Sequence, residues 1–308
     1  MEKNRNTGFL TSTIAFCVVA LAALPLRTFQ FLTNLEAGTG FYIDTSSILI
    51  YVLYGIIGAG IVISMASALL YKSELGFDRT PAKRPVQGII SLLTAVAVLF
   101  DAALDLNTIL NYSAQNSDMT KVALYVLCAQ SLFAVLAAIF FVVFGISMLS
   151  GTTNASEYKI ISVAPTVWFM FRLIYRFTAT ISFLKVSDLF FEMLMLAFML
   201  IFFTAFAQLN SKIESNGLDW RLVAFGLPAA VLALICFIPR FIMVISGKSE
   251  ALYTGSPVEY CDLMTALFAL SIVLTRIGWI GGNADAKEEA EAQAEATEQA
   301  EEEESEDK

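Results

Sequence analysis

The sequence predicts an all-α protein, a bundle of about eight transmembrane helices, and three observations lead to this fold class. Hydrophobic residues make up 57% of the 308 positions and charged residues only 15%. The mean hydropathy is +0.70, well above the range of soluble globular domains. The apolar residues also gather in runs of about 20, the length that an α-helix needs to cross the hydrocarbon core of a bilayer. The first partner predicted for this chain is therefore the lipid bilayer.

The apolar runs predict where the spans lie. Four of the runs, the first, second, fourth and sixth, are strongly apolar, whereas the other four contain charged residues. A seven-span arrangement therefore stays open as an alternative. The eight predicted spans are residues 9–26, 48–70, 88–110, 122–149, 160–184, 189–209, 221–246 and 258–280.

The first apolar segment has a second interpretation. Lys3 and Arg5 precede the run, and Ala20-Leu21-Ala22 provides an A-x-A pattern, as in a cleaved signal peptide. The apolar character continues through Leu26, which favours a retained membrane anchor. Both interpretations leave the topology of the later spans unchanged.

The net charge of −9 comes from one end of the chain. Residues 281–308 contain twelve Asp and Glu but two Lys, a net charge of −10, so residues 1–280 carry +1. We therefore divide the chain into a transmembrane domain, 1–280, and an acidic tail, 281–308. Like-charge repulsion and a lack of apolar residues predict that the tail is disordered. The almost neutral body gives no reason to expect a nucleic-acid partner.

The placement of Lys and Arg predicts the orientation, because cytoplasmic loops are enriched in these residues. If the N-terminus is inside, nine of them lie near inner span ends and four near outer ends. The prediction is thus N-in and C-in, with a cytoplasmic acidic tail. The inner residues are Lys3, Arg5, Lys72, Arg79, Lys83, Arg84, Lys159, Lys212 and Arg221, and the outer ones are Arg27, Lys121, Lys185 and Lys248.

Charged residues within the spans are the candidate site. A charge at mid-membrane costs about 2.5–3.5 kcal/mol on insertion scales, so such groups usually face one another, a cavity or the interface. In the predicted topology all nine lie in the outer half, and three pairs are spaced i,i+4 on one helix face. This candidate intramembrane charge network consists of Asp101, Asp105, Arg172, Arg176, Asp188, Glu192, Arg240, Glu259 and Asp262.

Depth along the spans suggests how these charges pair. The short connection between the fifth and sixth spans makes them neighbours, which places Arg176 at the level of Glu192. Arg172 lies one helical turn deeper, and Asp101 is the carboxylate closest to that depth. We therefore expect an Arg172–Asp101 pair.

Two functions fit such a network. The first is a non-catalytic membrane scaffold or accessory protein, whose bundle is held together by the charges and which binds an unidentified protein partner. The alternative is a solute-binding or transport protein, with a charged cavity that opens to the outer side and takes a small charged solute. A water-accessible cavity reaching Arg172 and Asp101 would favour transport, and a dry, paired network would favour the scaffold.

Enzyme activity is not favoured by the sequence. The chain has no histidine, which excludes H-E-x-x-H zinc proteases, histidine-ligated haem and Ser-His dyads. It also has no G-x-x-x-x-G-K-[ST] phosphate loop. We therefore predict no catalytic residue, no metal site and no cofactor.

About a third of the chain resembles a known group of sequences. The resemblance rests on Val163-Ala164-Pro165-Thr166-Val167-Trp168, Phe171-Arg172-Leu173-Ile174, the 189–208 stretch with Glu192, and Pro239-Arg240. These segments are similar to an uncharacterised family of multi-pass membrane proteins from clostridia and related Firmicutes. The resemblance implies a location in a bacterial cytoplasmic membrane and assigns no role to any residue.

Overall fold

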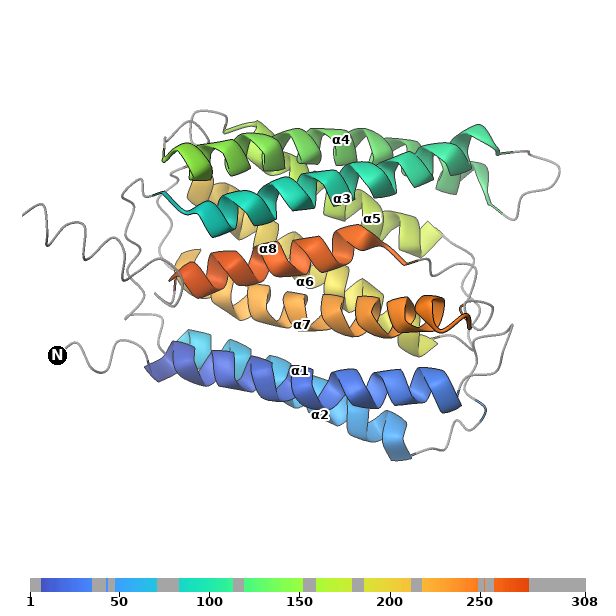
Figure 1. Ribbon diagram of the computed structural model, residues 1–308, viewed down its shortest axis with the longest axis vertical. Helices are drawn as coiled ribbons and strands as arrows, with labels where there is room; N and C mark the ends of the chain where they lie inside the picture. The colour runs from blue at the N-terminus through green and yellow to red at the C-terminus, as the bar shows by residue number, and fades with distance from the viewer. Residues whose placement is uncertain are drawn as a thin grey trace, which may run out of the picture.

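The computed structural model describes residues 7–34, 43, 48–70, 83–112, 119–151, 159–178, 186–211, 218–248, 252 and 258–276. These residues form eight α-helices that lie side by side along one axis (Figure 1). No strand occurs in these ranges, so the predicted all-α class is confirmed for them. The helices are α1 (Thr7–Thr33), α2 (Ile48–Leu70), α3 (Pro85–Leu110), α4 (Lys121–Ser150), α5 (Ala164–Thr178), α6 (Val186–Asn210), α7 (Leu218–Ile245) and α8 (Tyr260–Arg276), and a 3₁₀ turn, Ile161–Val163, precedes α5.

Six of the helices are long and apolar enough to cross a membrane: α1, α2, α3, α4, α6 and α7. The other two are shorter, since α5 has 15 residues and α8 has 17. Their predicted spans, 160–184 and 258–280, extend into parts of the chain outside the described residues. The acidic tail, 281–308, lies outside them as well.

Helix α7 is the centre of the bundle. Its most apolar window is 83% buried, whereas the corresponding windows of α1 and α2 are each 28% buried. It packs against α6, α8, α1 and α2, while α3 packs against α4 and α8. Figure 1 shows the α3–α4 pair on one side, the α1–α2 pair on the other, and α5–α8 between them. Helices α5–α8, which carry most of the charged candidate residues, therefore lie between the two pairs.

Helix α1 is longer than the predicted first span, which we ended at Leu26. It continues through Pro25 to Thr33. Proline removes only the one hydrogen bond that its missing N–H would have donated to the Leu21 carbonyl. The continued helix carries Arg27 into the bundle, where it is 2% exposed. Arg27 therefore lies within the helix and not beyond its end, as the predicted span implied.

Local sequence explains the ends of α4. The Thr120 hydroxyl accepts a hydrogen bond from the Ala123 N–H at 3.2 Å and caps the first turn. Gly151 follows the helix with φ 73°, a left-handed conformation that glycine adopts without a Cβ clash. These signals fix α4 as a 30-residue helix.

Two glycines allow α3 and α4 to pack closely. A Cβ added to Gly145 of α4 would lie 3.0 Å from the carbonyl oxygen of Gly88 in α3. One added to Gly88 would lie 2.9 Å from the Gly145 carbonyl oxygen. The side chains of Leu149 and Leu92 are also close, but the backbone oxygens cannot move aside as a flexible side chain would. Small residues commonly permit this kind of approach between membrane helices.

Gly145→Val should therefore destabilise the protein by about 1–3 kcal/mol, the usual cost of overpacking. SDS titration in mixed micelles measures the change in the free energy of unfolding. The control is Gly55→Val in α2, where an added Cβ meets no atom within 4 Å. Equal losses from the two variants would contradict the close α3–α4 approach.

Candidate functional site

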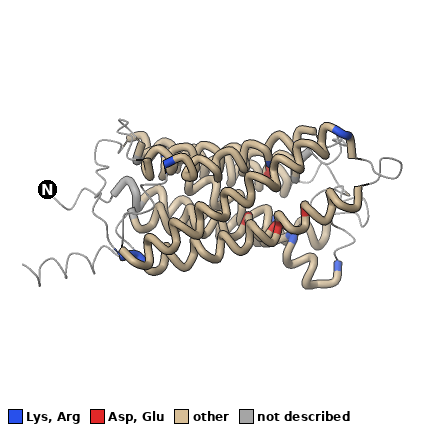
Figure 2. Tube along the Cα trace, turned by 90° about the horizontal axis from the view of Figure 1, so that it is seen from above, with Lys and Arg blue, Asp and Glu red and all other residues tan. Residues whose placement is uncertain are grey.

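Charged side chains gather inside the bundle because of how α5 is patterned. Its buried residues include Trp168, Phe169, Arg172 and Arg176, which recur at spacings of three or four positions and so share one helix face. The face that packs on the neighbouring helices therefore contains two arginines. In Figure 2 the acidic residues lie between the middle of the bundle and the end away from the N-terminus.

Arg172 is held by two carboxylates of α8 and its N-terminal edge. Its Nη2 atom donates to Asp262 Oδ1 at 2.7 Å and also pairs with Glu259 Oε2. The guanidinium carbon lies 5.2 Å from the Trp168 ring centroid and 5.4 Å from that of Phe169. Arg172 is 4% exposed and Asp262 2%. Two charges and two aromatic faces thus replace the water that this cation loses on burial.

Arg176 extends the network to α6 and α7. Its Nη2 atom is 2.6 Å from Glu259 Oε1, and its Nε atom pairs with Glu192 Oε1. The other Glu192 oxygen accepts from Arg240 Nη2 at 3.0 Å. Glu192 is 0% exposed and Arg240 2%. A continuous series of ion pairs therefore joins four helices, with three arginines alternating with three carboxylates.

Helix α3 meets the network through Asp101. The Asp101 Oδ2 atom accepts a hydrogen bond from the Cys261 N–H at 2.7 Å. Cys261 is the second residue of α8, so a carboxylate from another helix satisfies one of its unpaired N-terminal donors. The negative charge also lies at the positive end of the α8 dipole.

Asp101→Ala should cost about 0.5–2 kcal/mol, as the loss of a helix N-cap does. Asp101→Asn should cost less, because the amide oxygen can still accept the Cys261 N–H. The free energy of unfolding in mixed micelles measures both. If Asn proves as harmful as Ala, the carboxylate has a role other than capping.

The predicted Arg172–Asp101 pair was wrong. Arg172 pairs with Glu259 and Asp262 instead, and the two Asp101 oxygens form no ion pair with any described residue. Asp101 instead faces the start of α8. The expected proximity of Arg176 and Glu192 is confirmed by their ion pair.

The structure places eight of the nine predicted residues in or beside this network. Six form the ion pairs, and Asp101 contacts Cys261. Asp105 accepts a hydrogen bond from Gln130 Nε2 of α4 at 2.7 Å. Asp188 belongs to α6, but its side chain lies outside the described residues.

Two polar residues in this region were missing from the sequence-based site. One is Gln130, the only amide or charged residue between Val122 and Leu149, a signal that the sequence did contain. The other is Arg27, whose guanidinium carbon lies 4.6 Å from the Phe31 centroid and 5.6 Å from the Phe191 centroid. Phe191 immediately precedes Glu192, so Arg27 approaches the network from α1.

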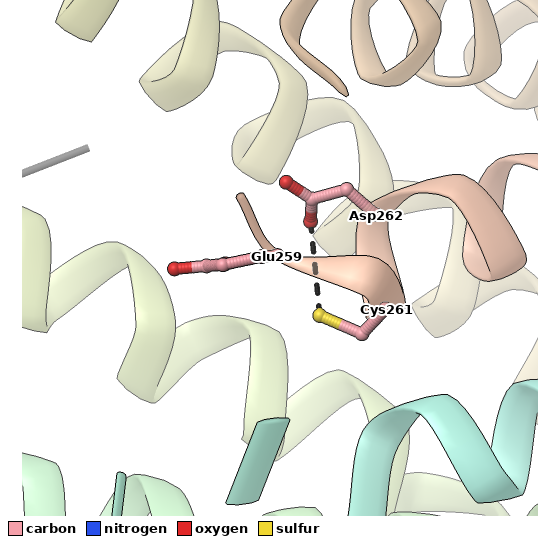
Figure 3. A group of neighbouring side chains, drawn as sticks. All are labelled: Glu259, Cys261 and Asp262. Carbon is pink, nitrogen blue, oxygen red and sulfur yellow. Dashed lines mark hydrogen bonds between the residues drawn. The ribbon is translucent and has the colours of Figure 1, made fainter. Parts of the chain in front are cut away.

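One group of side chains near the start of α8 has metal-ligand chemistry. Glu259, Cys261 and Asp262 place potential ligand atoms within 4.8 Å of one another (Figure 3). The Cys261 thiol lies 3.9 Å from Asp262 Oδ1. Both carboxylates, however, already pair with Arg172 or Arg176, so a metal ion would have to displace or approach an arginine cation. The arrangement therefore favours ion pairing over metal binding.

Comparisons of the chain with protein-family models, curated proteins and solved structures found no match. The function is therefore inferred from the geometry of the site.

Proposed function

We propose that this chain is a non-catalytic scaffold or accessory protein of a membrane, whose helical bundle is fixed by the buried ion pairs. The observation that carries the proposal is the matching of charges: three arginines meet three carboxylates across α5–α8. A site built to bind a charged solute needs groups that are left for that solute. Here the arginines are instead occupied by residues of the chain itself.

The burial of the network supports a packing role. Glu192, Arg240 and Asp262 are each at most 2% exposed, whereas the Glu259 side chain, at 19%, is the most exposed member. Removing one partner of a buried ion pair leaves an uncompensated charge, so such a pair makes one helix arrangement much more favourable than its alternatives. A rigid bundle of this kind is suited to holding a partner protein in the membrane.

The proposal includes a membrane topology. We place eight spans in an N-in and C-in orientation. Six of the described helices are long and apolar enough to cross a membrane, and the excess of Lys and Arg at one predicted side supports the orientation. The acidic tail then lies in the cytoplasm, where it is available to a partner. The resemblance to clostridial proteins supports a bacterial cytoplasmic membrane as the location.

One observation favours the alternative, a solute-binding or transport protein. Arg172 Nη1 and Asp101 Oδ1 are buried without a hydrogen-bond partner. Such atoms are usually satisfied in native proteins, by the protein or by an ordered molecule. A small zwitterionic solute has both the acceptor and the donor that these two atoms require.

Uptake into proteoliposomes separates the two functions. The full chain is reconstituted and tested with labelled amino acids, dicarboxylates and polyamines, alongside Arg172→Lys as the matched variant. The scaffold proposal predicts no flux above that of empty liposomes, and a larger complex that survives mild-detergent extraction of native membranes. Flux or solute-dependent thermal stabilisation that Arg172→Lys abolishes would overturn the scaffold proposal and establish the alternative.

A further inference from the structure

Asp105 differs from the other carboxylates of this region that the structure describes. Glu192, Glu259 and Asp262 are each paired with an arginine. Asp101 has no such partner but accepts the Cys261 N–H at the positive end of α8. Among the residues that the structure describes, Asp105 has neither kind of partner, since the one hydrogen bond of its carboxyl group is with the neutral amide of Gln130.

The surroundings of Asp105 make an unpaired negative charge unfavourable. It is half-buried on α3, among the lipid-facing residues Leu104 and Leu106, which are 48% and 50% exposed. In a bilayer, these exposed side chains contact hydrocarbon rather than water, and an ionised carboxylate beside them is costly.

The charged and polar groups that face Asp105 come from three helices. Asp101 on its own helix opposes a second negative charge, while Arg172 and Arg176 of α5 favour it. Both arginines are already held by two carboxylates each, which offsets their attraction. Tyr175 of α5 and Gln130 of α4 are neutral neighbours, and α8 faces Asp101 through Cys261.

The Gln130 amide indicates how the charge is removed. Gln130 is 7% exposed, and its Nε2 atom donates to Asp105 Oδ2 at 2.7 Å. Its Oε1 atom is buried without a hydrogen-bond partner. A buried acceptor of this kind requires a donor, and the amide that carries it already lies against the Asp105 carboxyl group. A carboxylate has no hydrogen to donate, whereas a carboxylic acid has one.

We propose that Asp105 is a proton-binding site, and that its neutral carboxylic acid donates a hydrogen bond to Gln130 Oε1. Gln130 Nε2 donates to one Asp105 oxygen, and the protonated oxygen donates back to the amide. This closed acid–amide pair gives both polar groups of Gln130 a partner and removes the negative charge of Asp105. It goes beyond a scaffold role, because loss of the proton breaks one of the two bonds joining these side chains of α3 and α4.

Infrared spectroscopy of the full chain in lipid nanodiscs tests the site at neutral pH. The expected result is a carbonyl-stretching band of a protonated carboxyl that shifts in D₂O and disappears in Asp105→Asn. The matched control, Asp101→Asn, should keep the band. Gln130→Leu should keep it but move it to higher frequency, since the acid then loses its hydrogen-bonding partner, and this variant leaves Asp105 itself intact.

Two results would overturn the proposal. The first is the absence from the wild-type spectrum of any protonated-carboxyl band that depends on Asp105. The second is evidence that the site takes a metal cation: a fall in melting temperature of the wild type, but not of Asp105→Asn, when sodium is replaced by choline at constant ionic strength. A melting temperature that is independent of sodium, together with the Asp105-dependent band, supports the proton site.

Discussion

Glu192→Gln should lower the free energy of unfolding by about 3–5 kcal/mol, the usual cost of removing one partner from a buried ion pair. Glu192 is fully buried and pairs with both Arg176 and Arg240, so its loss leaves two arginines short of a carboxylate in the interior. Glutamine keeps the side-chain volume, which limits the effect to charge and hydrogen bonding. SDS titration in mixed micelles gives the free energy.

A double-mutant cycle shows whether the effect comes from pairing. Arg240→Met alone should also destabilise the protein, since it deprives Glu192 of a partner. Glu192→Gln combined with Arg240→Met should cost clearly less than the sum of the single losses. Each single variant leaves the other residue charged and without this partner, whereas the double variant removes both charges. Simple additivity would show that the two residues are not coupled.

Arg172→Met should also destabilise the bundle by about 3–5 kcal/mol. Glu259 and Asp262 would lose a shared cation, and the aromatic faces of Trp168 and Phe169 would lose their contact with it. Arg172→Lys should recover only part of the loss, because a single ammonium lacks the planar fork that arginine offers to two carboxylates. The same mixed-micelle titration compares the two variants.

Arg221 provides the matched control for Arg172. It also lies on a core helix and also approaches an aromatic ring, with its guanidinium carbon 5.8 Å from the Trp220 centroid. It forms no ion pair with any residue that the structure describes. Arg221→Met should therefore cost only about 0.5–1 kcal/mol, the value of an exposed cation–π contact. A loss as large as that of Arg172→Met would mean that ion pairing is not what makes Arg172 important.

Hydropathy predicted most of the fold because a bilayer imposes a simple rule on length and composition. The predicted span 48–70 coincides with α2, and 122–149 differs from α4 by one residue at each end. The first span was drawn only to Leu26, where the apolar run meets Arg27, whereas α1 continues to Thr33. Hydropathy does not show that a helix continues past a charged residue, so the sequence alone could not place Arg27 in the bundle.

The sequence predicted which residues form the candidate site, but not all of the contacts between them. Hydropathy locates a charge along a span, which correctly placed Arg176 beside Glu192. It does not say which way a helix face turns, so Asp101 was assigned to Arg172 rather than to the α8 N-terminus. Gln130 was overlooked because the predicted site was drawn from charged residues alone, although burial makes the hydrogen bonds of an uncharged amide important.

If the ion-pair network is dry and structural, a native cysteine can report on it directly. Cys261 is 1% exposed and lies between Asp101 and Asp262. Replacing Cys17 and Cys128 with Ser, and Cys236 with Ala, leaves Cys261 as the only cysteine. The control is a second variant in which Cys261 is replaced as well and Asn111→Cys provides a single cysteine. Asn111 is exposed at the end of α3, so this cysteine should react fast.

The decisive measurement is the rate at which a charged, membrane-impermeant methanethiosulfonate labels Cys261 in the folded protein. A dry network predicts no labelling of Cys261 until SDS unfolds the chain, under conditions in which the Asn111→Cys control is labelled completely. Labelling of Cys261 in the folded state, at a rate that a bound solute reduces, would show a water-filled route to the network and contradict the account.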